Sequence, residues 1–240
     1  MRLLALLGFR DEVDEIPQFL ANVAPQVDGI VALDHGSIDG STELLLDEPK
    51  LVEMLNRPRS APWDAGLHHR ILIEAGVRHG ADWLLGIDAD ERLEQSFGER
   101  IRSRIAADHG RGHDAYAHPI LELWDRRDTY RVDGIWGEKA RTSLFRASED
   151  HRFVERPLHA QWASTSGPPF GRHPRIDARV YHLGMLSRED RSARQARFRK
   201  LDPDGRWQRI GYDYLTDESG LRLERIEAGR EYEETIGGER

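Results

Sequence analysis

Three carboxylates stand together in the sequence LLGIDADERL, residues 84–93: Asp88, Asp90 and Glu91. The apolar run before them predicts a buried strand, in which Asp88 and Asp90 would point to one face and Glu91 to the other. Two like charges in one small space are unfavourable unless one carboxyl takes up a proton or a cation lies between them. The spacing therefore predicts a divalent metal site at Asp88 and Asp90.

The composition narrows the choice of metal. None of the 240 residues is a cysteine, so disulfides and thiolate metal sites are excluded. A metal must then be bound by Asp, Glu or His, and such ligands favour a hard ion such as Mg²⁺ or Mn²⁺.

A second polar stretch, LDHGSIDGSTE (33–43), follows another predicted strand. That strand would end at Asp34, and Gly36 would allow a tight turn. Nearby hydroxyl and carboxylate side chains could accept from the exposed amides of the turn and of the next helix. Two interpretations stay open at this point, a well-capped strand-to-helix turn and a ligand site.

The elements that must position these residues alternate along the first half of the chain. Hydrophobic periodicity predicts strands over 2–9, 28–34, 50–56 and 81–88, and helices over 11–24, 39–48, 64–80 and 96–108. This order predicts an α/β fold with a mainly parallel twisted sheet and helices on both faces. Ligands of such sheets bind at the carboxyl ends of the strands, where Phe9, Arg10, Asp34, Asp88 and Asp90 would gather.

The second half has a different pattern. Segments 114–125, 139–146, 152–162 and 176–184 are typical of strands separated by loops rich in Gly, Pro and charge, which predicts additional mixed or antiparallel strands. A strongly basic helix is expected over 187–202. The acidic end, 227–240, is expected to be frayed or disordered.

Charge and hydropathy exclude some partners. The formal net charge of −8 argues against general affinity for nucleic acid or anionic lipid. The apolar run LLALLGF near the start is too short to cross a bilayer and lacks the layout of a secretory signal. We therefore expect no transmembrane segment and a cytoplasmic protein, either free or peripheral to the membrane.

The two acidic stretches, in this order, resemble those of GT-A fold glycosyltransferases of the large family-two group. LDHGSIDGSTE corresponds to the turn of that group, WLLGIDADERL to its Asp-x-Asp strand end, and LLGFRDEVDEIPQFL to its first strand and helix. The resemblance covers residues 2–95, and more loosely 130–146 and 180–184. It implies transfer of a sugar from a nucleoside diphosphate to an acceptor hydroxyl, with inversion and with Mn²⁺ or Mg²⁺ on the diphosphate.

The resemblance also implies a division of the chain. Residues 1–110 would form the nucleotide-sugar-binding half of one GT-A domain, 111–202 its acceptor-binding half, and 203–240 a partly disordered C-terminal extension. The acceptor stays open between a glycan, a lipid-linked sugar, a natural product and a protein.

The metal roles implied by the resemblance fall on three residues. Asp90 would coordinate the metal directly, and Asp88 would contact it through water or bind the donor ribose. His182, in the sequence VYHLG, is a candidate third ligand, with a structural histidine as the equal alternative.

The donor would be bound by residues from several segments. Phe9 could stack on the base, next to Arg10, and Asp34 could accept from base or ribose donors. Arg70 is a candidate phosphate ligand or a solvated helical Arg. Arg188, with Arg191 and Arg194 at helical spacing, could bind the diphosphate.

The catalytic base is the least specified residue. An inverting transferase needs a carboxylate or imidazole that reaches the acceptor hydroxyl. Where relatives carry a His-Glu pair, this chain has His159 and Ala160, so the expected carboxylate is missing. We favour Glu138 as the base with His159 behind it. Further candidates are Asp133 and Glu155, and nearby Trp136 could stack on an acceptor sugar or pack in the core.

Three other functions use a similar acidic strand end. A sugar nucleotidyltransferase would be expected to have a glycine-rich basic loop after the first strand, where this chain reads LGFRDEVDE. A phosphohydrolase with Asp88 as nucleophile would have its DAD motif on the first strand and not the fourth. A non-catalytic carbohydrate- or protein-binding module would leave the acids as a solvated loop. Metal-dependent binding of a nucleoside diphosphate distinguishes the transferase from the hydrolase and the module.

Overall fold

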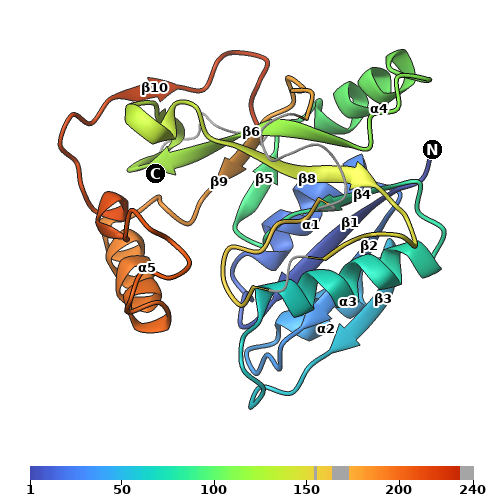
Figure 1. The fold of residues 1–240 in the computed structure, drawn as a ribbon, viewed down its shortest axis with the longest axis horizontal. Helices are drawn as coiled ribbons and strands as arrows, with labels where there is room; N and C mark the ends of the chain where they lie inside the picture. Colours follow the sequence, from blue (N-terminus) through green and yellow to red (C-terminus); the bar gives the residue numbers. More distant parts are fainter. Residues whose placement is uncertain (154–155, 164–172, 233–240) are drawn as a thin grey trace.

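Figure 1 shows the fold of the chain in a computed structural model that describes residues 1–153, 156–163 and 173–232. Its strands form one sheet, with the order β10-β7-β6-β8-β4-β1-β2-β3 along the main path, and β5 and β9 branch from this path. The predicted α/β class with a parallel first half and a mixed second half is confirmed.

The first half contains the parallel strands. β1 lies between β2 and β4 and is parallel to both, and β3 is parallel to β2. Mostly apolar residues make up these strands, and those of β1, β2 and β4 are almost entirely buried, as expected for a parallel sheet covered on both faces. The strands are β1 (Leu3–Phe9), β2 (Gly29–Asp34), β3 (Leu51–Asn56) and β4 (Trp83–Gly86).

Helices cover both faces of the parallel strands. Leu3, Ala5 and Leu7 pack in one core with apolar residues of α1, α2 and α4, while Leu4 and Leu6 pack in a second core against α3. This alternation follows from the two-residue period of a strand. The helices are α1 (Ile16–Val23), α2 (Ser41–Leu46), α3 (Ala65–Arg78) and α4 (Phe97–Ala107).

The second half extends the sheet with antiparallel strands. β8 pairs with β4 and with β6, and β6 pairs with β7, which in turn pairs with β10. The short strand β5, directly after the acidic turn, pairs with β9, and β9 is parallel to β6. These elements are β5 (Glu91–Leu93), β6 (Ala115–Trp124), β7 (Arg126–Arg131), β8 (Ala140–Arg146), β9 (Val180–His182), α5 (Arg188–Leu201) and β10 (Leu223–Arg225).

Several predicted boundaries differ from the structure. The first helix begins at Ile16 and not at residue 11, with Pro17 in its first turn. The strand expected over 152–162 is absent from its described residues, where Pro157 and a positive φ of 54° at His159 interrupt an extended chain. β7 and β10 were not predicted, because their charged residues hide the alternation that marks a strand.

The acidic end of the chain is packed up to residue 232, contrary to the expectation that it frays from residue 227. Arg230 donates to the buried carboxylate of Glu94 (2.6 Å) and to Asp177 (2.9 Å). Tyr232 is 2% exposed and lies against Tyr181. Ion pairs and an aromatic contact therefore hold this segment, although its composition is typical of a disordered tail.

Candidate active site

The acidic stretch forms a turn between β4 and β5 and does not continue the strand. β4 ends at Gly86, and the N–H of Glu91 donates to the carbonyl of Asp88 (3.0 Å). The side chain of Glu91 closes the turn further, since it accepts from the N–H of Asp88 (3.0 Å). The predicted alternation that put Asp88 and Asp90 on one strand face is therefore wrong, and the two carboxylates contact different cations.

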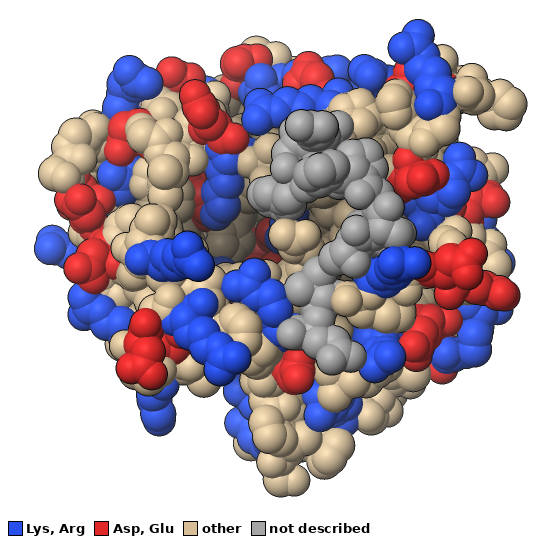
Figure 2. Space-filling view, viewed as in Figure 1, with Lys and Arg blue, Asp and Glu red and all other residues tan. Residues whose placement is uncertain are grey.

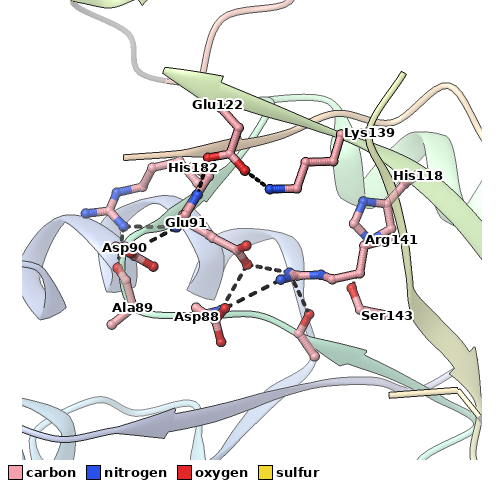
Figure 3. Close-up of polar contacts among 12 residues, drawn as sticks. Asp88, Ala89, Asp90, Glu91, His118, Glu122, Lys139, Arg141, Ser143 and His182 are labelled. Atoms are coloured by element: carbon pink, nitrogen blue, oxygen red, sulfur yellow. Dashed lines mark hydrogen bonds and ion pairs between the residues drawn. The ribbon is translucent and has the colours of Figure 1, made fainter. Parts of the chain in front are cut away.

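Asp90 begins a chain of ionic contacts that leads into the antiparallel half of the sheet (Figure 3). Its Oδ2 lies 3.1 Å from Nε2 of His182 and 3.4 Å from a guanidinium nitrogen of Arg194. On the other side of the imidazole, Nδ1 of His182 contacts the carboxylate of Glu122, which also accepts from Lys139. The register of β6 and β9 sets Glu122 opposite His182. Negative and positive groups therefore alternate through the whole row.

The charges of this row are set by its own members. Burial by itself would lower the pKa of His182, but the carboxylates of Glu122 and Asp90 raise it to about 10. Burial would raise the pKa of both carboxyl groups, and the charge of His182 holds both pKa values well below the usual range. Without another cation, the imidazole is therefore protonated and both acids are ionised.

A second ion pair fixes the other side of the turn. Glu91 is 2% exposed, and Arg141 of β8 donates to its carboxylate (2.5 Å). Burial raises the pKa of Glu91, and the charge of Arg141 opposes that rise. Arg141 also lies 3.4 Å from Asp88, whose side chain is 50% exposed. Asp88 is thus the carboxylate of the turn that remains most open to solvent.

Arg92 fixes the backbone of the acidic turn. Its side chain is fully buried and donates to the carbonyls of Ala89 (2.7 Å) and Glu91 (2.8 Å). The same guanidinium donates to the carboxylate of Glu15 (2.5 Å), at the start of α1. A buried charge that satisfies turn carbonyls fixes the backbone on which Asp88 and Asp90 stand.

The structure explains why the sequence VYHLG ends in a glycine, Gly184. A Cβ at this position would overlap Oδ2 of Asp90, Nε2 of His182 and a guanidinium nitrogen of Arg194. The absence of a side chain therefore lets these three polar groups converge beside the backbone of Gly184.

A cavity of about 710 Å³ lies beside these residues. Figure 2 shows a hollow in this face of the molecule with Lys and Arg side chains around it. The wall of the cavity includes Asp88, Glu91, Glu122 and His182 from the ion-pair networks, together with the cations Lys139, Arg141, Arg194 and Arg197. Such a wall suits a ligand that carries both a cation and negative charge.

The basic helix α5 contributes fewer arginines to the cavity than its spacing predicted. Arg188 is exposed and does not line the cavity. Arg191 is 2% exposed and stacks on Trp124, so it belongs to the core. Arg194 does reach the site, and Arg197, one turn further, lines the cavity without a hydrogen bond or ion pair to another described residue.

Asp34 and the following loop form a well-capped turn. One carboxylate oxygen of Asp34 accepts from the N–H and hydroxyl of Ser37 (2.8 and 2.7 Å), and the other accepts from Thr42 (2.9 Å). Asp34 is 5% exposed. Of the two interpretations of this stretch, the geometry therefore favours the capped turn, which leaves Asp34 few lone pairs for a nucleoside.

The aromatic residue beside the strand ends is Trp63 and not Phe9. Phe9 is 1% exposed and packs in the core with α1, so its ring has no face available to a base. Arg10 lies 5.6 Å from the ring of Trp63. Trp63 is 37% exposed, lines the cavity, and contacts the buried His35 and His68.

Of the remaining predicted residues that the structure describes, His159 alone lines the cavity. Arg70 is exposed on α3 and pairs with Glu74 (3.5 Å), and Glu138 is also exposed; neither lines the cavity. Asp133 is paired with Arg131 (2.8 Å), whose hydrogen bond lowers the pKa of Asp133 to about 2. Trp136 is 4% exposed in a core cluster, and Glu155 lies outside the described residues.

The prediction from sequence missed four charged residues near the acidic turn. Glu122 and Arg141 lie within strands, and Lys139 directly precedes β8. For Glu122 a signal existed, since it is a single acid in the apolar strand sequence HPILELW. Glu12 faces the turn from the loop after β1, where burial and the charges of Asp90 and Glu15 raise its pKa to about 7.

In the described part of the chain, no three His, Asp or Glu residues are grouped so that they could together hold a metal ion. No helix there is both long and apolar enough to cross a membrane.

No protein-family model matches the chain. A TPR repeat-containing protein of Synechococcus elongatus is 29% identical to it over 150 residues, which are 62% of this chain and 32% of that protein. The chain thus spans about a third of the length of the curated relative that it matches.

Solved structures with a similar fold include one from S. aureus and one from Mycobacterium tuberculosis. TarS 1–349 of S. aureus aligns with 91% of this chain and 70% of its own, at 11% identity and a TM-score of 0.48. Glucosyl-3-phosphoglycerate synthase of Mycobacterium tuberculosis, solved with Mn²⁺ and UDP, aligns with 51% of this chain and 44% of its own, at 16% identity and a TM-score of 0.33. At these TM-scores the alignments do not assign a function.

Proposed function

We propose that this protein is a metal-dependent glycosyltransferase that moves a sugar from a nucleoside diphosphate to an acceptor hydroxyl. The observation that supports this best is the pair formed by Asp90, in the turn after β4, and His182, the last residue of β9. Their facing atoms lie 3.1 Å apart, beside a cavity of about 710 Å³ with four Lys or Arg side chains in its wall.

Asp90 and His182 fit a hard divalent ion. Neighbouring ligands of an octahedral Mg²⁺ or Mn²⁺ are about 3 Å apart when each metal–ligand distance is about 2.1 Å. The contact of His182 Nδ1 with Glu122 leaves Nε2 to face Asp90, as in histidines that bind metals with a carboxylate behind them. Mg²⁺ keeps sites for phosphate and water, so two protein ligands suffice, with Asp88 as a water-mediated third.

The metal would act as a Lewis acid on the diphosphate as it leaves the sugar. The protein's own cations would share that task. Arg194 and Arg197 come from α5, and Lys139 and Arg141 come from the antiparallel half. Fixed cations aimed at the leaving group stabilise the negative charge that develops on it.

The nucleoside would lie at the ends of β1 and β2. Because Phe9 is buried, we assign the base-stacking role to Trp63, which has an exposed face and Arg10 nearby. Backbone groups after Phe9 and the capped turn at Asp34 would shape this end of the site. Inversion at the sugar and a cytoplasmic location belong to the proposal, and the acceptor is left open.

Calorimetry with UDP, GDP and dTDP, each with and without Mn²⁺, tests the proposal. We expect one of them to bind at least about tenfold more tightly when Mn²⁺ is present, since the metal links the carboxylate to the phosphates. The matching nucleoside monophosphate serves as the control and should gain less. Equal, metal-independent affinities for all three diphosphates would contradict the proposal.

Gly184→Ala should weaken metal-assisted binding without unfolding the protein. The added methyl group would displace the ends of three flexible side chains, Asp90, His182 and Arg194, and not the backbone. We expect the Mn²⁺-dependent affinity for the best nucleotide to fall about 10- to 100-fold, as for disturbed metal surroundings in general.

Gly110→Ala is the control for this glycine variant. Gly110 has a φ of 85° and nothing within 4 Å of a new Cβ, so the change strains the backbone at a residue that does not line the cavity. It should lower the melting temperature but leave nucleotide affinity unchanged. If Gly184→Ala also leaves the nucleotide affinity unchanged, the close approach of the three polar groups at Gly184 has no part in binding.

A further inference from the structure

His159 belongs to a hydrogen-bonded chain that runs from the cavity wall into the C-terminal segment. Its Nε2 lies 3.1 Å from the phenol oxygen of Tyr212, and that oxygen lies 2.8 Å from Oδ2 of Asp202. Tyr212 is 3% exposed and Asp202 is 4% exposed, whereas His159 lines the cavity. The chain thus connects two buried residues to one that faces the ligand space.

Only one placement of the hydrogen atoms is consistent with the contacts of His159, Tyr212 and Asp202. The backbone N–H groups of Trp207 (3.1 Å) and Gln208 (3.2 Å) donate to the same carboxylate oxygen of Asp202. These donors and the phenol of Tyr212 outweigh burial and lower the pKa of Asp202, so the carboxylate is ionised and only accepts. Tyr212 must then donate its single hydrogen to Asp202 and accept one from Nε2 of His159. The proton of the neutral imidazole is on Nε2, which leaves a lone pair on Nδ1.

The surroundings of His159 keep the imidazole neutral. Although His159 is exposed overall, partial desolvation of its ring lowers the pKa of His159, and the charge of Arg156 lowers it further. Arg194 and Lys139 act in the same direction, and only Asp202 opposes them. An imidazole that is neutral at physiological pH and has a free lone pair is able to accept a proton.

The backbone supports a functional role for this residue. His159 has a φ of 54°, in the left-handed region that non-glycine residues rarely occupy. The preceding segment is fixed on the start of α3, where the N–H groups of Ala65 and Gly66 donate to the carbonyls of Pro157 (3.1 Å) and Arg156 (2.9 Å). Strained residues held by their surroundings are often found at functional sites.

We propose that Nδ1 of His159 is the general base that removes the proton from the acceptor hydroxyl, and that Tyr212 and Asp202 are its positioning residues. As the acceptor oxygen bonds to the anomeric carbon, the bond to the diphosphate oxygen breaks and its electron pair leaves with the nucleoside diphosphate. The acceptor proton moves to Nδ1 and is later released to water.

This inference rests on the proposed function and supplies the general base that the proposed function does not yet name. Glu138, which the sequence analysis favours as the catalytic base, is exposed and does not line the cavity. Ala160, next to His159, lacks the carboxylate of the His-Glu pair. Asp202 and Tyr212 lie in another segment of the chain and orient the imidazole of His159.

The tautomer can be measured without any activity. Two-bond ¹H–¹⁵N spectra of protein with ¹⁵N-labelled histidine, assigned with His159→Gly, report which ring nitrogen carries the proton. We expect a neutral imidazole at pH 7.5 with the proton on Nε2, and a mixture of tautomers in Tyr212→Phe. A proton on Nδ1, or a protonated ring at pH 7.5, would overturn the assignment.

Turnover supplies the second measurement, with hydrolysis of UDP-glucose and UDP-N-acetylglucosamine in Mn²⁺ as the probe. His159→Gly should lower kcat about 10²- to 10⁴-fold with KM for the donor unchanged, and added imidazole should restore part of the loss. Glycine tolerates the positive φ, so this variant should fold. Because the pKa of His159 is lowered, kcat of the wild type should fall only at a pH below the usual imidazole pKa of about 6.5. Tyr212→Phe should shift that limb.

The outcomes separate this inference from the proposed function. If a nucleotide binds with Mn²⁺ and His159→Gly keeps the full rate, the base is wrong and the transferase assignment stands. If no nucleoside diphosphate binds, the transferase assignment fails even where the predicted tautomer is observed. Loss of rate without imidazole rescue and without a changed pH profile would assign His159 a structural role only.

Discussion

Asp90→Asn should abolish the Mn²⁺-dependent part of nucleotide binding. Asn keeps the shape of the side chain but removes the charge that Asp90 shares with His182 and Arg194. We expect the gain in affinity from Mn²⁺, at least about tenfold in the wild type, to disappear, because a direct ligand matters more than the residues behind it. Calorimetry of the best nucleoside diphosphate, with and without Mn²⁺, measures this gain directly.

Asp47→Asn is the matched control for the loss of one negative charge. Asp47 is exposed at the end of α2 and has no side-chain contact among the described residues. The control should bind nucleotide with Mn²⁺ as the wild type does. If Asp90→Asn keeps the full metal-assisted gain, the metal site is not at Asp90.

Arg92→Met should strongly destabilise the fold. Its guanidinium is fully buried and donates to the carbonyls of Ala89 and Glu91 and to the carboxylate of Glu15. Glu15 is 29% exposed and can be solvated, but the carbonyls of Ala89 and Glu91 would lose a buried donor, which costs about 1–3 kcal/mol. We therefore expect the free energy of unfolding, measured in urea, to fall by about that amount.

An exposed arginine gives the comparison for Arg92. Arg111 is 67% exposed and lies 3.4 Å from Asp108, a pair of the kind that contributes little. Arg111→Met should change the free energy of unfolding by less than about 0.5 kcal/mol. A loss below about 1 kcal/mol in Arg92→Met would mean that the acidic turn does not depend on this guanidinium.

The parallel half of the fold follows directly from the sequence. Its strands are continuous apolar runs and its helices have clear apolar faces, and both signals are local. β7 and β10 lack such signals, because they pair at a sheet edge and have charged residues. β4 ends two residues early because the side chain of Glu91 bonds back to the backbone of Asp88, a contact that no pattern of hydrophobicity encodes.

The candidate site was predictable only where its residues stand at strand ends. Asp88, Asp90 and His182 are polar residues next to apolar runs, and the structure brings each to the cavity or its edge. Glu122 and Arg141 join them through pairings between distant strands, which a single sequence does not reveal. Phe9 shows the opposite error, since an aromatic residue at a strand end can equally turn toward the core.

The ion pairs around the acidic turn also link the two halves of the chain. Within the described residues, Asp88, Asp90 and Glu91 pair with Arg141, His182 and Arg194, all of which follow residue 110. A fragment that stops near residue 110 would keep the three acids and lose these counter-charges. Exchange of residues 1–110 between related chains would succeed only if the opposing cations were transplanted with them.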